Sequence, residues 1–242
     1  MSHERPFSST LLLAAGVLTA FACQQASASC AKPWIFFDVG DTLVNASPDP
    51  KNLGHMKDER YVKGALPYLS QLKKKGYTLG LISNIPPTWG DEGEFHQVPD
   101  KRTRQLLFAQ KSFQQDWKKG EPEFDWSFFG KIKGSGNHRI FEGRIFFPNH
   151  ISERKPLTCS ECILNRGLES AKAAGCQAIY IGESQAEMNA AEKAGFVPFW
   201  YRADSQNAKF LPLNRIKDYV AHYHAGDWKE SAPQLKAEPL RK

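Results

Sequence analysis

The sequence predicts an α/β fold in which helices cover both faces of a mostly parallel sheet. The first observation behind this prediction is that short apolar segments alternate along the chain with longer, partly polar segments of helical length. The second is that three of the apolar segments end directly in polar residues, as strands do where their carboxyl ends border a ligand crevice. The chain has 242 residues, of which 41% are hydrophobic and 24% are charged, so it can bury one sizeable core.

The first part of the chain supplies three of the expected strands and two of the expected helices. The strands expected near residues 34–39 and 77–82 are largely apolar. Between them, a helix near 63–75 is amphipathic and ends in three lysines, which complement the negative end of the helix dipole. A helix near 102–116 and a strand near 140–147 follow. Because helices separate these strands, we expect the strands to pair in parallel.

The second part of the chain continues the same alternation. Its expected elements are a helix near 160–174, a strand near 177–182, a helix near 185–194, a strand near 196–201 and a helix near 213–224. A mixture of Lys, Glu and Pro follows and predicts a disordered tail over residues 229–242. One α/β domain over residues 29–228 is therefore expected.

Residues 1–28 are predicted to be a secretory signal peptide. An apolar run of 12 residues, Leu11–Ala22, precedes a small-x-small cleavage pattern that ends at Ala28. The run is too short for a membrane span, which needs about 20 apolar residues, so we expect no transmembrane segment. A lipoprotein signal with Cys23 as the acylated residue is the less favoured alternative. Either signal predicts a location in the bacterial periplasm or outside the cell.

Four cysteines remain in the expected mature chain, namely Cys30, Cys159, Cys162 and Cys176. An even number of cysteines in an oxidising compartment favours disulfides. Cys159 with Cys162, or Cys30 with Cys176, are the pairings considered. A C-x-x-C pair is also found in redox-active sites, particularly at the start of a helix, where a thiolate is stabilised. That alternative is less favoured, because nothing else around the pair resembles a thioredoxin-like unit.

Asp38 stands at the end of the first predicted strand, and the sequence Val-Gly-Asp-Thr-Leu follows it. This position places a carboxylate at the edge of the sheet where ligands of α/β proteins bind. Asp38 is therefore a candidate nucleophile or metal ligand. The alternative is that it forms a turn or a helix cap, as Asp often does after a strand.

Three further segments carry polar groups in comparable places. The second strand ends in Ser83 and Asn84, Lys155 precedes a proline, and the fourth strand runs into Glu183, with Glu187 four residues further on. Each segment also has a simpler interpretation. Lys155 lies in a charged run typical of a solvated surface, and the two glutamates stand where a helix dipole favours acidic side chains.

Taken in order, the four segments resemble the motifs of the haloacid dehalogenase-like (HAD) hydrolase superfamily. The matching residues are Asp38–Leu43, Ser83, Lys155 with its proline, and Gly182–Glu187. The resemblance covers residues 33–201, apart from a long divergent stretch between Ser83 and Lys155. It implies a Rossmann-like fold with a catalytic site at the carboxyl ends of the strands.

The resemblance also implies phosphoryl transfer. Asp38 would attack phosphorus and form an aspartyl-phosphate, while Lys155 and a Mg²⁺ ion would neutralise the charge of the transition state. The implied Mg²⁺ ligands are Asp38, the Gly40 carbonyl, Glu183 and Glu187. The implied phosphate-binding residues are Ser83, Asn84 and Thr42. The substrate class would be small phosphorylated molecules.

Two departures from the family pattern bear on the chemistry. Phosphatases of this family carry a general acid/base Asp two residues after the nucleophile, where this chain has Gly40. Asp41 is adjacent and is the candidate replacement, although a shift of one residue turns its side chain in another direction. Losing a general acid slows a reaction by about 10² to 10⁴. We therefore expect a slow Mg²⁺-dependent phosphomonoester phosphatase, or alternatively a weakened member that binds a phosphorylated ligand or protein partner.

The second departure from the family pattern is glutamate in place of aspartate at both acidic positions of the fourth motif, Glu183 and Glu187.

Charge and aromatic content add two expectations. The formal net charge of +6 favours an anionic substrate, but the basic residues are scattered, so no nucleic-acid partner is expected. An aromatic-rich insertion occupies residues 86–150, between the second and third motifs. It is expected either to form a lid over the site or to pack its aromatic residues on the core or on a second subunit.

Overall fold

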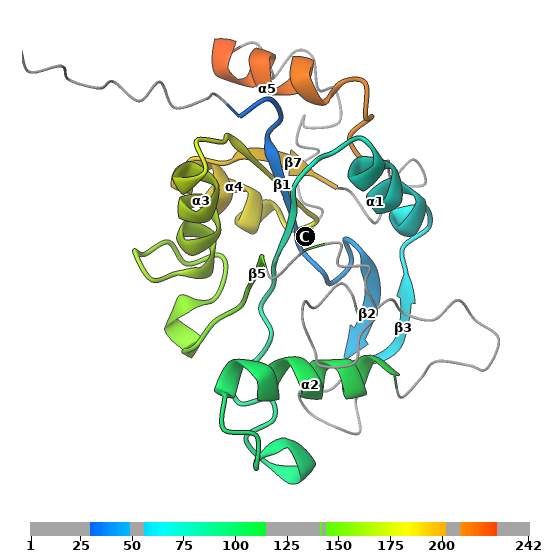
Figure 1. The fold of residues 1–242 in the computed structure, drawn as a ribbon, viewed down its shortest axis with the longest axis vertical. Coiled ribbons are helices and arrows are strands. Elements are labelled where there is room, and N and C mark those ends of the chain that lie inside the picture. The colour runs from blue at the N-terminus through cyan, green and yellow to red at the C-terminus, as the bar shows by residue number, and fades with distance from the viewer. Residues whose placement is uncertain (1–29, 49–55, 115–140, 142–143, 202–208, 227–242) are drawn as a thin grey trace, which may run out of the picture.

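The computed structural model describes residues 30–48, 56–114, 141, 144–201 and 209–226. Its centre is a sheet of five strands in the order β5-β4-β1-β6-β7, and every neighbouring pair is parallel (Figure 1). The strands are β1 (Trp34–Phe37), β4 (Leu79–Ile82), β5 (Ile145–Phe146), β6 (Ala178–Gly182) and β7 (Val197–Trp200). The predicted α/β, Rossmann-like fold class is confirmed.

Helices cover both faces of this sheet. The helices that the structure describes are α1 (Ala65–Lys74), α2 (Lys101–Gln114), α3 (Ile163–Ala173), α4 (Gln185–Ala194) and α5 (Ile216–Ala225). Side chains of β1 alternate between the two faces, as a strand requires. Ile35 and Phe37 pack with residues of α1 and α5, whereas Phe36 packs with residues of α3 and α4. Each face therefore has its own apolar core.

The core around Phe36 is tightly packed. Its ring lies 5.7 Å from the ring of Phe196 and 6.0 Å from that of Phe146. Helix α3 approaches β4 closely at Gly167, where an added Cβ would lie 2.5 Å from the Ile82 side chain. A larger residue at Gly167 would push α3, and the segment that leads into it, away from the sheet.

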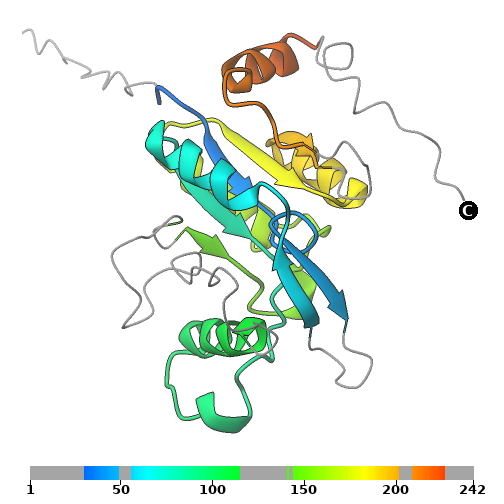
Figure 2. The ribbon, with the colours of Figure 1, turned by 90° about the vertical axis from the view of Figure 1, so that its right-hand side faces the viewer.

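A hairpin between β1 and α1 was not predicted. Strands β2 (Val44–Pro48) and β3 (Met56–Tyr61) pair in antiparallel and form a separate two-stranded sheet. Both strands are rich in polar residues and lack the apolar alternation that marks a strand in sequence. Figures 1 and 2 show the hairpin beyond the carboxyl ends of the central strands, together with α2, whereas α5 lies at the opposite end.

Several predicted boundaries differ from the structure. Helix α3 begins at Ile163 rather than near 160, because the bonded pair Cys159 and Cys162 precedes it. Helix α5 begins at Ile216 rather than 213, after a turn. Of the strand expected near 140–147, the structure assigns only β5. The predicted signal peptide and carboxyl-terminal tail lie outside the described residues, as do residues 115–140 and 142–143 of the insertion expected over 86–150.

Both proposed cysteine pairings are present as disulfides, Cys30–Cys176 and Cys159–Cys162. Among the helices that the structure describes, none has the length and apolar character needed to cross a membrane.

Candidate active site

Polar residues follow three neighbouring strands at the carboxyl edge of the sheet. Asp38 follows β1, Ser83 follows β4, and Glu183 follows β6. Glu187 lies in the first turn of α4, directly after β6. Lys155 follows the short 3₁₀ helix η3 (Ile151–Glu153), after the edge strand β5. Parallel pairing brings these segments together, because the carboxyl ends of neighbouring parallel strands lie at the same edge.

The Lys155 ammonium group occupies the centre of this group of side chains. Its Nζ lies 2.5 Å from Asp38 Oδ1, 2.8 Å from Glu187 Oε2 and 2.7 Å from the Tyr180 hydroxyl. The Lys155 side chain is only 1% exposed and that of Asp38 is 9% exposed. The alternative of a solvated surface lysine is therefore wrong.

Three carboxylates cluster at this edge, and two of them, Asp38 and Glu187, contact the Lys155 ammonium group. One oxygen from each of Asp38, Glu183 and Glu187 lies within 4.8 Å of the others. With all groups ionised, three negative charges face the single positive charge of Lys155. The set of hard oxygen ligands and the uncompensated negative charge both suit a divalent cation such as Mg²⁺. The alternative in which the glutamates only complement the α4 dipole does not account for this convergence.

Burial governs the protonation of these groups. The pKa of Asp38 is raised to about 7, mainly by burial; Lys155 opposes this increase, and the negative charge of Glu183 contributes to it. Burial also raises the pKa of Glu187, again against the influence of Lys155. Burial alone would lower the pKa of Lys155, but Asp38 and Glu187 outweigh it, so the pKa is raised and the ammonium form is retained. A bound cation would favour the ionised form of each carboxylate.

Tyr180 is part of the site and was not predicted. Its side chain is fully buried on β6, and its hydroxyl accepts a hydrogen bond from Lys155 and donates one to Glu187 Oε2 at 3.0 Å. Burial raises the pKa of this phenol well above its usual value, so it remains a donor. The sequence feature that could have indicated this role is the Tyr180 hydroxyl, the single polar side-chain group in an otherwise apolar strand, because a buried tyrosine hydroxyl needs a hydrogen-bond partner.

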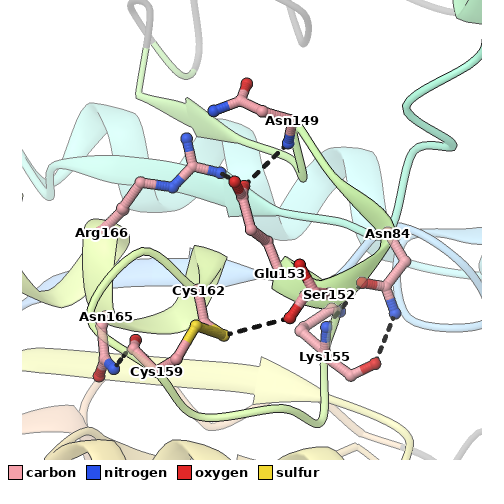
Figure 3. The surroundings of a disulfide bond; sticks show 9 residues. All are labelled: Asn84, Asn149, Ser152, Glu153, Lys155, Cys159, Cys162, Asn165 and Arg166. Carbon is pink, nitrogen blue, oxygen red and sulfur yellow. Dashed lines mark hydrogen bonds and ion pairs between the residues drawn. A yellow bond between two sulfur atoms is a disulfide. The ribbon is translucent and has the colours of Figure 1, made fainter.

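Two of the predicted phosphate-binding residues hold other site residues in place. The Asn84 side chain donates to the Lys155 carbonyl at 3.1 Å and accepts from the Lys155 amide at 2.8 Å (Figure 3). The buried Thr42 hydroxyl donates to Glu183 Oε2 at 3.0 Å. Both contacts position a charged side chain of the site. Ser83 lies at the predicted edge, with its amide bonded to the Phe146 carbonyl at 3.0 Å.

The loop after Asp38 shows where the family pattern is altered. At Gly40, an added Cβ would meet no other atom within 4 Å. Space for a side chain therefore exists where the family's phosphatases carry their general acid. Asp41 adopts a left-handed backbone with φ of 50°, which Asp tolerates better than most residues, and its side chain is exposed. Its carboxylate is not among the three that cluster near Lys155.

The described part of the insertion packs against loops at the same edge of the sheet. On α2, the buried Gln105 side chain donates to the carbonyls of Pro86 and Pro148, at 3.1 and 3.5 Å. The ring of Phe108 lies 5.2 Å from that of Trp89. These contacts fix α2 near the loops that follow β4 and β5. The aromatic residues between 115 and 140 lie outside the described residues.

Fold and site together define an α/β domain that gathers one lysine and three carboxylates at the carboxyl edge of a parallel sheet. No protein-family model matches the chain, and the comparison with curated proteins finds no match. The comparison with solved structures finds similar folds among HAD-superfamily proteins, the group that the sequence motifs resemble.

Three of these structures illustrate the similarity. The D,D-heptose 1.7-bisphosphate phosphatase from B. bronchiseptica, complexed with magnesium and phosphate, is 15% identical, with 75% of this chain and 89% of that chain covered and a TM-score of 0.39. A putative HAD-like phosphatase from Mesorhizobium loti is 14% identical, with 80% and 87% covered and a TM-score of 0.37. A HAD-superfamily hydrolase from Ehrlichia chaffeensis is 14% identical, with 80% and 98% covered and a TM-score of 0.37.

The carboxylate cluster predicts binding of a divalent cation. Adding Mg²⁺ at about 100 times its dissociation constant should raise the free energy of unfolding by about 2.7 kcal/mol, measured by denaturant titration. Glu183→Gln removes one charged ligand and should weaken binding at least about tenfold. The matched control is Glu169→Gln on the exposed face of α3, which should leave the Mg²⁺ effect intact. Equal stabilisation of both variants by Mg²⁺ would place the cation elsewhere.

Proposed function

We propose that the protein is a Mg²⁺-dependent phosphomonoester phosphatase that works through an aspartyl-phosphate on Asp38. The observation that carries this proposal is the contact of 2.5 Å between Lys155 Nζ and Asp38 Oδ1, inside a cluster of three carboxylates. Phosphoryl transfer needs a nucleophile, a fixed positive charge and a metal-binding group within a few ångströms of one another. The described residues bring candidates for all three to one edge of the sheet.

In the first step, a carboxylate oxygen of Asp38 attacks phosphorus and the bond from phosphorus to the ester oxygen breaks. Lys155 is close enough to Asp38 to stabilise the phosphoryl oxygens while charge moves across them. In the second step, water attacks phosphorus, the bond to Asp38 breaks, and inorganic phosphate leaves. Asp38, Glu183 and Glu187 would hold Mg²⁺, with the Gly40 carbonyl as a further ligand, and this ion would neutralise phosphate charge and orient the oxygens.

Proton transfer is the step for which the site has no side chain at the usual position. The leaving alkoxide needs a proton and the attacking water must lose one, yet Gly40 has no side chain to do either. Asp41 is the adjacent candidate for this role, and its exposed side chain gives it access to solvent. Without a well-placed acid, the rate should fall by about 10² to 10⁴ relative to a complete site. Gly40 is also the observation that favours the second candidate, a protein that binds a phosphorylated ligand with little or no turnover.

Export belongs to the same proposal. Residues 1–28 would be removed as a signal peptide, and the mature protein would act in the periplasm or outside the cell. The two disulfides support an oxidising compartment, because disulfides persist there and are rare in the cytosol.

The first test is hydrolysis of a panel of phosphate monoesters by the purified chain. Turnover should need Mg²⁺, and Asp38→Asn should lower kcat by at least about 10³, since the covalent step is then lost. Glu169→Gln should match the wild type. No activity above the Asp38→Asn background, on any ester, would reject the phosphatase and leave the ligand-binding candidate.

Restoring the missing acid provides a gain-of-function test. Gly40→Asp should raise kcat by about 10²-fold or more, because general acid catalysis contributes on this scale and the site has room for the side chain. Gly40→Asn is the matched control, since it has nearly the same shape but is not a comparable acid. A gain in both variants, or in neither while both remain folded, would contradict the assignment of the defect to position 40.

Tyr180 is expected to act as a positioning residue for Lys155. Tyr180→Phe removes two hydrogen bonds to charged groups, the one from Lys155 and the one to Glu187. Each is worth about 1.5 to 3 kcal/mol, so kcat should fall at least about 10-fold with little change in KM. Tyr219→Phe is the control, because that buried hydroxyl instead donates to the Pro198 carbonyl on the opposite face of the sheet. Equal effects of the two variants on kcat would indicate a general packing defect.

A further inference from the structure

The two disulfides of the described chain differ in what they connect. Cys30–Cys176 joins residues 146 positions apart and ties the segment before β1 to the turn after α3. Cys159–Cys162 joins residues only three positions apart. In the chain-entropy description, stabilisation of the fold by a disulfide increases with the length of the loop that it closes. The Cys159–Cys162 bond therefore stabilises the fold less than the Cys30–Cys176 bond does, and its presence is better explained by its reactivity in thiol–disulfide exchange.

The two sulfurs of the short bond have different environments. Cys159 is exposed, whereas Cys162 is completely buried and forms the N-cap of the 11-residue helix α3 (Figure 3). A thiolate at a helix N-terminus is stabilised by the helix dipole and by the free amide groups of the first turn. Burial of Cys162 opposes this stabilisation, so the direction of attack follows from exposure: an incoming thiol reaches the Cys159 sulfur, and Cys162 is the leaving group.

The bond can open without releasing the segment that contains it. Glu153 accepts hydrogen bonds from Arg166 at 3.0 Å and from the Asn149 amide at 2.9 Å, which fasten the turn before Lys155 to α3. Asn165 donates to the Cys159 carbonyl, and Asn84 holds the backbone of Lys155. All these contacts are independent of the S–S bond (Figure 3). Reduction should therefore occur in the folded protein.

The surface beside Cys159 is apolar. Of the described residues, Ile151 and Leu157 are large hydrophobic side chains that remain 66% and 51% exposed, and both lie on the segment that leads to Cys159. Ile151 is also close to the bond in space, because the carbonyl oxygen of the adjacent Ser152 lies 3.7 Å from Cys162 Sγ. An apolar surface next to an accessible disulfide suits a protein partner better than a small charged thiol.

We propose that Cys159–Cys162 is a thiol–disulfide exchange site for a protein dithiol of the thioredoxin type. A thiolate of the dithiol attacks Cys159 Sγ, the S–S bond breaks, and Cys162 leaves as a thiolate that takes up a proton. The second thiol of the partner then attacks the mixed disulfide and releases Cys159 as a thiol. Two electrons and two protons pass to the pair, and the partner becomes a disulfide. This activity is separate from phosphate chemistry and does not depend on it.

The test follows the thiols of the folded full chain during incubation with reduced thioredoxin, with alkylation and peptide mass spectrometry as the readout. Cys159 and Cys162 should become reduced at least about tenfold faster than Cys30 and Cys176, with circular dichroism unchanged. Equal rates for the two pairs, or reduction only after unfolding, would overturn the exchange site. Reduced glutathione at the same thiol concentration should act more slowly, and an equal rate would overturn the choice of a protein partner.

A pair of variants tests the assigned roles of the two sulfurs. Cys162→Ser leaves the exposed Cys159 as a free thiol, which should displace one thiol from glutathione disulfide and form a mixed disulfide. In Cys159→Ser the remaining thiol is buried, so its capture should be at least about tenfold slower. Capture of glutathione at equal rates by both variants would show that exposure does not distinguish the two sulfurs and would contradict the proposed direction of attack. Because neither readout uses phosphate esters, failure here is distinguishable from failure of the phosphatase proposal.

Discussion

The buried contact between Lys155 and Asp38 is the interaction on which the rest of the site depends. A charged lysine in this position is tolerated only because the carboxylates of Asp38 and Glu187 and the Tyr180 hydroxyl satisfy its three donors. Such a buried charged cluster is poor evidence for stability, because the desolvation penalty offsets most of the Coulombic gain. Its presence at the edge of the sheet that binds ligands is better explained by chemistry.

The fold holds this cluster together by contacts between segments that are far apart in sequence. Lys155 and Asp38 are 117 positions apart in sequence. The Asn84 side chain, 71 positions from Lys155, forms hydrogen bonds with the backbone of Lys155. On the other side of the cluster, the Thr42 hydroxyl and the Trp200 indole each bond to Glu183, through its carboxylate and its carbonyl. The parallel order β4-β1-β6 brings the three strand ends into line, and these contacts then set the directions of the side chains.

Local sequence patterns were sufficient for the central sheet and for the residues that the four motifs place at its edge. Apolar runs such as Trp34–Phe37 specify buried strands by themselves, and the strand ends then carry Asp38, Ser83 and Glu183 to the same edge. The roles of Asn84 and Thr42 were not predictable, because a side chain's partner 71 or 141 residues away depends on tertiary geometry. Tyr180 was missed for another reason: in sequence it fits the apolar core of its strand, and only its hydroxyl indicates that it needs a partner.

The β2/β3 hairpin was not predicted, because its paired strands lack the apolar alternation by which a strand is recognised in sequence. Gly40, in contrast, was visible in the sequence, and the structure adds that its neighbourhood has room for a side chain. In the mechanism that we propose, the nucleophile Asp38 and the positive charge of Lys155 are in place, and the usual proton donor is absent at Gly40. Because the usual acid/base would protonate the leaving alkoxide and also activate water, its absence should slow both the formation and the hydrolysis of the aspartyl-phosphate intermediate.

Direct detection of that intermediate tests the central claim. The full chain would be mixed with Mg²⁺ and a hydrolysable phosphate monoester, quenched in acid, and digested for peptide mass spectrometry. We expect phosphate on the Asp38 side chain of the peptide that contains it, and no such species in Asp38→Asn. Consumption of the ester with no phosphate on Asp38, or with phosphate on another residue, would contradict it.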